Sequence, residues 1–382
     1  MSDLRKSPER IDLLHADDPR DVVHRAVACL GQGGVVALPT ETSYILAARA
    51  LEPAAVDRLR AMKSRPNAHP LSVSVRSPDE VFDWVPDLSP VGCKLARRAW
   101  PGPMTLVIRG DVRNGLASRL HAEVRSIVAP DSTIGLRLPD HDAVREILEL
   151  VLGPLVLTDA PGRDGDRAVR PDDLADLDEL DMILDDGPVP TEARNSVVRL
   201  DGSDWSLIRA GAIDQDAVQR MTCTILLFVC TGNTCRSPMA EAICRLVLAE
   251  RLGCRPDEVE TLGYSVASAG LAASRGARAA SEAIDVVHAR GGDLRPHCSR
   301  QVTSTMIARA DLIVTMTRDH LDALLDVHPE AEDRVRLLHP RGADIADPIG
   351  TDRETYLHTA DAIEAHLKAL FDEIGLRANR VH

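Results

Sequence analysis

Short apolar runs alternate with amphipathic stretches along the first 214 residues, which is the pattern of strands separated by helices. The expected strands span residues 35–38, 70–75, 104–109, 133–139, 154–158, 195–200 and 206–209, and the expected helices span 21–30, 54–62 and 142–152. Residues 1–20 are charged and expected to be loose. Residues 163–186 are rich in Asp and Gly and are predicted to form an exposed loop. The alternation predicts an α/β domain with a mixed, twisted sheet.

The second part of the chain repeats the alternation with longer helices. Strands are expected at residues 225–229, 266–270, 311–316 and 335–338, and helices at 238–252, 277–289, 318–325 and 354–371. Parallel strands with helices on both faces place a site at the carboxyl ends of the strands. A helix expected at 212–222 joins the two parts directly, without a low-complexity linker. The sequence therefore predicts two α/β domains that join at about residues 212–222.

Composition narrows the range of partners. Lys and Arg number 45 against 59 Asp and Glu, for a net charge of −14, so no basic footprint for stable, direct nucleic-acid binding is expected. The 8 cysteines are scattered without the paired spacing of a metal site, so no metal is predicted. No secretory hydrophobic region opens the sequence and no apolar run reaches the ~18 residues of a membrane helix. A cytoplasmic, reducing location without membrane association is expected.

One stretch combines an anion-binding loop with a nucleophile. Residues 229–238, Val-Cys-Thr-Gly-Asn-Thr-Cys-Arg-Ser-Pro, lie between an expected strand and an expected helix. Backbone N–H groups at such a helix start face an anion, and the Arg236 guanidinium can add a forked pair of hydrogen bonds. The same positive field favours the thiolate of Cys230, a ready nucleophile. The remaining loop residues expected to hold phosphate are Thr231, Gly232, Asn233, Thr234, Cys235 and Ser237.

A simpler explanation exists for single residues of this loop. Gly232 and Asn233 suit a turn with φ > 0, while Ser237 and Pro238 suit an N-cap and a first helical turn. A capped helix beside a buried Cys230 would account for each feature alone. The combination of features at a strand–helix junction favours a phosphatase loop.

This stretch resembles the signature of the low-molecular-weight protein phosphatases, and the resemblance covers roughly residues 223–375. It implies a flavodoxin-like domain with a four-stranded parallel sheet, acting on a phosphorylated protein without cofactor or metal. It also implies that Cys230 attacks phosphorus, that Arg236 binds the phosphoryl oxygens and that Asp347, which precedes a proline, is the general acid. Ser268-Ala269-Gly270 matches a further strand of the family.

Two positions bear on the substrate of this phosphatase. Tyrosine-specific members typically carry Ile at the position of Thr234 and aromatic residues after the Asp-Pro pair, where this chain has Ile349 and Gly350. At both points the sequence resembles the arginine-phosphatase branch, so phosphoarginine is the expected substrate and phosphotyrosine the alternative. Arsenate reductases share the loop but need a further pair of cysteines, and only Cys298 lies beyond Cys254.

Cys235 shares the loop with the nucleophile and suggests a redox function. A disulfide between Cys230 and Cys235 would protect Cys230 from over-oxidation, and peroxide inactivation would then be reversible by a thiol. The alternative is a small loop residue packed inward.

The first part of the chain is similar to the Sua5/YrdC family over about residues 15–214. The similarity lies in VVALPTETSY, MKSRPNAHPL, WPGPMTLVI, TIGLRLP and LIRAGAI. It implies a YrdC-like twisted mixed sheet and a threonylcarbamoyl-adenylate synthase of the transfer-RNA modification pathway. Such an enzyme uses ATP with Mg²⁺, L-threonine and bicarbonate. The site residues that the resemblance implies are Thr40, Lys63, Arg65, Thr133, Arg137, Ser196 and Arg209.

The charges of the candidate residues agree with this resemblance, whereas several positions depart from the family pattern. Lys63, Arg65 and Arg209 could neutralise a triphosphate, and Arg137 could pair with the threonine carboxylate. Ile45 replaces a family Gly, while Asp159 and Pro161 replace the Ser and Asn of a Ser-x-Asn motif. Ile is expected to resist a conformation reserved for Gly, and Asp159 places negative charge where a substrate anion is expected. The alternative is therefore a domain that binds nucleotide without turnover.

Overall fold

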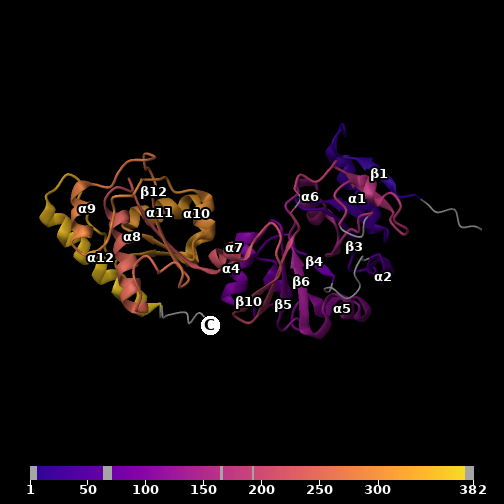
Figure 1. The fold of residues 1–382 in the computed structure, drawn as a ribbon, viewed down its shortest axis with the longest axis horizontal. Helices are drawn as coiled ribbons and strands as arrows, with labels where there is room; N and C mark the ends of the chain where they lie inside the picture. Colours follow the sequence, from indigo (N-terminus) through magenta and orange to yellow (C-terminus); the bar gives the residue numbers. More distant parts are fainter. Residues whose placement is uncertain (1–6, 63–70, 164–166, 192, 375–382) are drawn as a thin grey trace, which may run out of the picture. The chain divides into compact units, whose positions relative to one another are not determined.

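The computed structural model describes residues 7–62, 71–163, 167–191 and 193–374, and its chain divides into two compact units, Met1–Met221 and Thr222–His382 (Figure 1). Each unit has its own sheet and its own apolar core. Within the described residues, no helix combines the length and the apolar character needed to cross a membrane.

The first unit is built on a ten-stranded mixed sheet with the strand order β1-β8-β2-β3-β7-β4-β6-β5-β9-β10. Its strands are β1 (Glu9–Asp12), β2 (Val36–Pro39), β3 (Tyr44–Arg49), β4 (Ser72–Ser74), β5 (Met104–Arg109), β6 (Thr133–Arg137), β7 (Leu155–Asp159), β8 (Met182–Asp185), β9 (Ser196–Asp201) and β10 (Asp204–Arg209). Its helices are α1 (Pro19–Gly31), α2 (Pro53–Ala61), α3 (Val81–Trp84), α4 (Pro90–Ala99), α5 (Ala122–Val128), α6 (Asp142–Leu150) and α7 (Gln215–Thr222), with 3₁₀ turns at Leu116–Arg119, Pro130–Ser132 and Pro171–Leu174.

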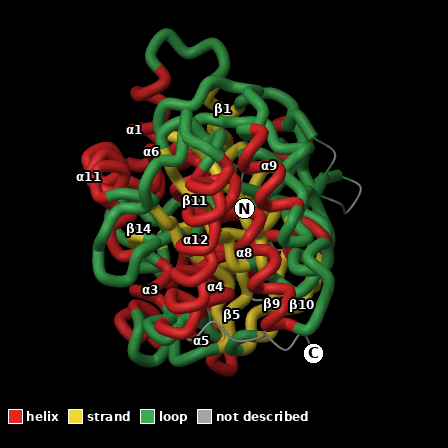
Figure 2. The backbone as a smooth tube through the Cα atoms, turned by 90° about the vertical axis from the view of Figure 1, so that its left-hand side faces the viewer, coloured by secondary structure: helices red, strands yellow, loops and turns green. Residues whose placement is uncertain are grey.

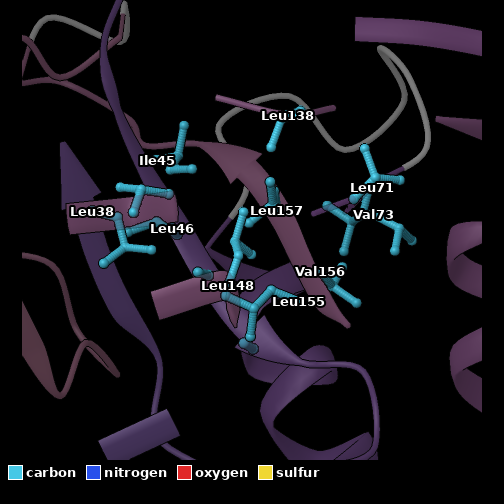
Figure 3. Packing of buried hydrophobic residues seen from close by; sticks show 14 of the residues in the cluster. Leu38, Ile45, Leu46, Leu71, Val73, Leu138, Leu148, Leu155, Val156 and Leu157 are labelled. Atoms are coloured by element: carbon cyan, nitrogen blue, oxygen red, sulfur yellow. The ribbon is translucent and has the colours of Figure 1, made fainter. Parts of the chain in front are cut away.

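The central strands of this sheet are apolar on both faces because helices or loops cover each side. Leu46 on β3 and Leu157 on β7 are buried near the middle of the sheet, as Figure 3 shows. β3 and β7 run antiparallel, and this pairing places Ile45 opposite Asp159. Packing in this core therefore fixes the carboxyl end of β7, where Asp159 lies.

Three strands of the first unit, and the helices α3, α4 and α5, were not predicted from the sequence. β8 lies inside the Asp-rich segment expected to be exposed loop, and it is buried because it pairs in parallel with both β1 and β2. β1 lies in the N-terminal segment expected to be loose, and β3 was not predicted as a strand. Both β1 and β8 are only four residues long, so their apolar periodicity is too short to detect beside charged neighbours.

The second unit has a four-stranded, fully parallel sheet in the order β12-β11-β13-β14, as the resemblance implied. Neighbouring strands in the chain are joined through helices, which are drawn in red in Figure 2. Its strands are β11 (Thr224–Cys230), β12 (Tyr264–Gly270), β13 (Leu312–Thr315) and β14 (Val335–Leu337). Its helices are α8 (Arg236–Leu252), α9 (Ser281–His288), α10 (Ser304–Arg309), α11 (Arg318–Val327) and α12 (Arg353–Glu373), with a 3₁₀ turn at Pro329–Arg334.

Alternating residues of β11 face two separate cores. Leu226 and Phe228 pack in the cluster that includes residues of α8, α9 and α12, whereas Leu227 and Val229 pack with residues of α10 and α11. A strand with period-2 side chains and helices on both faces requires this division. Cys230, the last residue of β11, continues the alternation of Leu226 and Phe228. It therefore packs in the same cluster as the residues of α8.

Candidate active sites

The nucleophile candidate of the second unit is buried and held by two polar groups. Cys230 is only 3% exposed. Its Sγ lies 2.9 Å from the Ser237 Oγ and 3.3 Å from the Asn233 backbone nitrogen, which donates to it. The Asn233 N–H therefore points at the sulfur, and Ser237 lies in the first turn of α8. Ser237 therefore contacts the cysteine rather than capping the helix, which begins one residue earlier at Arg236.

Asn233 holds the loop through its backbone and its side chain. It has φ of 55°, whereas Gly232 does not have positive φ. The Asn233 side-chain amide donates to the Oγ atoms of Ser237 at 3.0 Å and Ser268 at 2.9 Å. Its Oδ1 accepts from the backbone nitrogen of Arg300 at 3.0 Å. Its carbonyl oxygen lies 2.8 Å from the His297 Nε2. Asn tolerates this left-handed conformation well, and its amide adds cross-links that Gly could not provide.

Gly270 allows β12 to lie against the loop. A Cβ at this position would stand 2.4 Å from the Thr231 carbonyl oxygen and 3.0 Å from the Asn233 nitrogen. Both neighbours are backbone atoms, so neither could rotate away. Only glycine therefore permits the close approach of strand and phosphate loop.

Arg236 and Asp347 are brought together from positions far apart in the chain. The Arg236 Nη2 lies 2.5 Å from the Asp347 Oδ2, and its Nη1 donates to the Ile345 carbonyl oxygen at 3.1 Å. The arginine side chain is 6% exposed and the aspartate 40%. The structure thus brings together the residues predicted as phosphate ligand and general acid.

His320 was not predicted from the sequence. It lies in the first turn of α11, after β13, and its side chain contacts the loop. Its Nε2 lies 2.8 Å from the Thr231 Oγ1, and its Nδ1 lies 2.8 Å from the Thr317 Oγ1. Burial, assisted by the nearby positive charge of Arg236, lowers the pKa of His320. The signal available in the sequence was its place just after an expected strand, at the carboxyl edge where sites of parallel sheets lie.

The two remaining loop side chains face different surroundings. Cys235 is 5% exposed and its Sγ lies 3.2 Å from the hydroxyl of Tyr356 on α12. Burial, with the hydrogen bond to Cys235, raises the pKa of Tyr356. Thr234 is half-buried, and its Oγ1 lies 3.6 Å from the Cys235 Sγ. The inward packing expected as the alternative for Cys235 is thus observed, while its redox role stays a prediction.

In the first unit, three predicted residues converge. The Arg137 Nη2 lies 3.3 Å from the Thr40 Oγ1, and its Nη1 lies 3.8 Å from the Asp159 carboxylate. That carboxylate also accepts from the Arg209 Nη1 at 3.1 Å. Arg209 is held in turn by the Asn195 carbonyl oxygen, to which its Nε donates at 3.0 Å. The carboxylate predicted to repel a substrate anion is therefore paired with both arginines.

The other predicted residues of this unit lie elsewhere or outside the described part. The Ser196 hydroxyl is bonded to the Ile213 backbone, with distances of 2.8 and 2.9 Å. Thr133 is four residues from Arg137 along β6, or ~13 Å. Lys63 and Arg65 lie outside the described residues.

Ile45 differs from the prediction made for it. It lies in β3 with ordinary negative φ, because it is absent from the residues with φ > 0. The objection that an Ile could not adopt a Gly conformation is therefore wrong at this position. Pro161 forms an isolated bridge with Arg167, and it remains, with Asp159, a departure from the family pattern.

The fold and loop of the second unit place it among the phosphatases that use a cysteine nucleophile. Residues 225–380 match the model of the low molecular weight phosphotyrosine protein phosphatases. The chain is 34% identical over 153 residues to the protein-arginine-phosphatase of Bacillus subtilis (strain 168), covering 39% of this chain and 95% of that relative. It is 35% identical over 133 residues to the low molecular weight protein-tyrosine-phosphatase Wzb of Salmonella typhi, covering 34% and 80%. The chain belongs to this phosphatase family through its second unit.

The first unit is similar to proteins of the Sua5/YrdC family. Residues 28–211 match the Sua5, YciO and YrdC family model, described as telomere recombination. The chain is 27% identical over 203 residues to the threonylcarbamoyl-AMP synthase of Pyrococcus abyssi (strain GE5 / Orsay), covering 51% of this chain. The match spans 56% of the length of that relative.

Proposed function

We propose that the second unit is a protein-arginine phosphatase. Cys230 attacks phosphorus, and the phosphorus–nitrogen bond breaks as Asp347 donates a proton to the leaving guanidine. Arg236 and the loop N–H groups bind the phosphoryl oxygens throughout. Water then attacks the phosphocysteine, giving up a proton to Asp347 and releasing inorganic phosphate and the Cys230 thiolate.

The observation that carries this proposal is the lack of an aromatic wall around the site. The second unit has four aromatic residues, Phe228, Tyr264, Tyr356 and Phe371, and each is at most 3% exposed within the core. None is left to stack on a phenol ring. The residue after Asp347-Pro348 is Ile349, which is 65% exposed.

Thr234 supports the same substrate. Its hydroxyl lies on the loop beside Cys235, and its side chain is half-buried. Phosphoarginine presents N–H donors next to phosphorus, which a hydroxyl and the Asp347 carboxylate can accept, whereas an apolar wall cannot. The relatives named arginine and tyrosine phosphatases match the chain at 34% and 35% identity, so overall similarity favours neither substrate.

The test is a comparison of turnover on phosphoarginine and phosphotyrosine peptides. The native chain should prefer phosphoarginine, and Thr234→Ile should shift the ratio toward phosphotyrosine by about 1–3 kcal/mol, the cost of a misplaced polar contact. Thr234→Val is the matched control, because it removes the hydroxyl while keeping the shape. Cys230→Ser provides the inactive blank, since an alcohol is not ionised at neutral pH.

Two outcomes would contradict the assignment. A native preference for phosphotyrosine would make the unit an ordinary tyrosine phosphatase. A ratio unchanged in both Thr234 variants would remove the hydroxyl as the reason for selectivity.

For the first unit we propose binding of ATP and L-threonine for the synthesis of threonylcarbamoyl-adenylate from bicarbonate, with Mg²⁺ accompanying ATP. The convergence of Arg137, Arg209 and Thr40 supports it, because two guanidinium groups suit phosphate or carboxylate oxygens. Pyrophosphate release from ATP should require both L-threonine and bicarbonate and should disappear in Lys63→Ala. Release independent of threonine would favour nucleotide binding without turnover.

A further inference from the structure

Two arginines from different strands of the first unit converge on one carboxylate. Arg137 ends β6, Arg209 ends β10 and Asp159 ends β7. The Asp159 Oδ2 is 3.1 Å from the Arg209 Nη1, and its Oδ1 is 3.8 Å from the Arg137 Nη1. Each oxygen thus faces a different guanidinium, as the oxygens of a bound phosphate or carboxylate would.

Arg137 requires such a partner because it is buried. Its side chain is 3% exposed, and a buried charge without a counter-charge is strongly destabilising. The Arg137 Nη2 approaches Glu41 at 3.2 Å and the hydroxyl of Thr42 at 3.4 Å. Its Nε is buried without a hydrogen-bond partner among the described residues.

The two acidic partners of Arg137 are held differently. Glu41 is 18% exposed, and its other oxygen accepts from the Asp140 backbone nitrogen at 3.0 Å. Asp159 is 35% exposed, and its carboxylate pairs with the two arginines alone among the contacts described for it. Glu41 is therefore held in place by a backbone hydrogen bond, whereas the more exposed Asp159 carboxylate is free to rotate into solvent.

We propose that Asp159 is an internal ligand that occupies the anion site formed by Arg137 and Arg209. A dissolved anion binds there by displacing this carboxylate. A tethered group competes with an effective concentration on the order of millimolar or more, so external anions bind with reduced apparent affinity. Asp159 is then the residue that decides whether the first unit accepts anionic substrates. The inference rests on the anion-binding role proposed above for the two arginines.

The test measures binding of inorganic pyrophosphate by calorimetry to the full chain. All forms carry Arg236→Ala, which removes the anion-binding guanidinium of the phosphatase loop. Asp159→Ser and the isosteric Asp159→Asn should bind pyrophosphate roughly tenfold or more tightly than the form with Asp159. Adding Arg209→Ala to either variant should abolish the gain. Asp201→Ser, which removes the exposed partner of Arg109, is the matched control and should change nothing.

A second readout separates this idea from a purely structural ion pair. Without ligand, Asp159→Ser should melt at a lower temperature, because two arginines are left facing each other. Pyrophosphate should restore its melting temperature while scarcely changing that of the form with Asp159.

The outcomes distinguish the two proposals. Equal affinity with and without Asp159 would overturn internal occupation while leaving the arginines as an anion site. A gain that persists after Arg209→Ala would overturn it too, because the anion would bind elsewhere. Absence of pyrophosphate binding in every form would overturn the anion site and with it the internal ligand.

Discussion

His320 is a residue whose protonation should be visible in the stability of the phosphatase unit. Burial lowers its pKa in the folded state, so the unfolded chain takes up the proton at a higher pH than the folded one. The contribution of neutral His320 is present above the ordinary value of about 6.5 and is lost as pH falls through the folded pKa. The melting temperature of the native chain should therefore fall between about pH 7.5 and about pH 5, which lie on either side of the ordinary histidine pKa. In His320→Asn this fall should be smaller.

The control for this prediction is His358→Asn, because the side chain of His358 is 76% exposed. That variant should follow the native pH profile. An unchanged profile in His320→Asn would show that protonation of this histidine is not linked to folding.

At the scale of elements, the packing of β12 on the phosphate loop should limit activity. Gly270→Ala places a methyl group 2.4 Å from the Thr231 carbonyl oxygen, so loop or strand must shift. We expect turnover to fall on the order of 10²-fold, because displacement of a catalytic group by about 1 Å costs that much. Stability should fall by about 1–3 kcal/mol through overpacking.

Gly31→Ala is the matched control, since a Cβ there meets nothing within 4 Å. Steady-state kinetics and chemical denaturation of both variants provide the comparison. Full activity in Gly270→Ala would mean that the loop tolerates movement and that the close approach has no catalytic importance.

At the scale of the whole molecule, each unit has an apolar core of its own. We therefore expect two unfolding transitions in calorimetry rather than one. Inorganic phosphate should raise the temperature of one transition through the phosphatase loop, by about 2.7 kcal/mol of stabilisation at 100 times its dissociation constant. Arg236→Ala should remove that shift. A single transition that phosphate moves as a whole would contradict independent units.

The sequence by itself determined the phosphatase loop and the order of most of the longer elements. These features are local: Cys230 and Arg236, with five residues between them, lie at the junction of an apolar strand and a long helix, so periodicity and spacing predict them without knowledge of distant contacts. The strand β5 was predicted with its observed bounds for the same reason. The strand β8 was not, because its burial depends on pairing with β1 and β2, and its own residues resemble a loop.

The tertiary structure decided which polar residues meet. Asp159 was recognised in the sequence as an unsuitable charge, but its pairing with Arg209, 50 residues away, depends on how the sheet orders its strands. The contact of His320 with Thr231 spans 89 residues, and Gly270 matters only because the folded loop lies against it. Such contacts are set by packing of the complete sheet, and no local pattern in the chain encodes them.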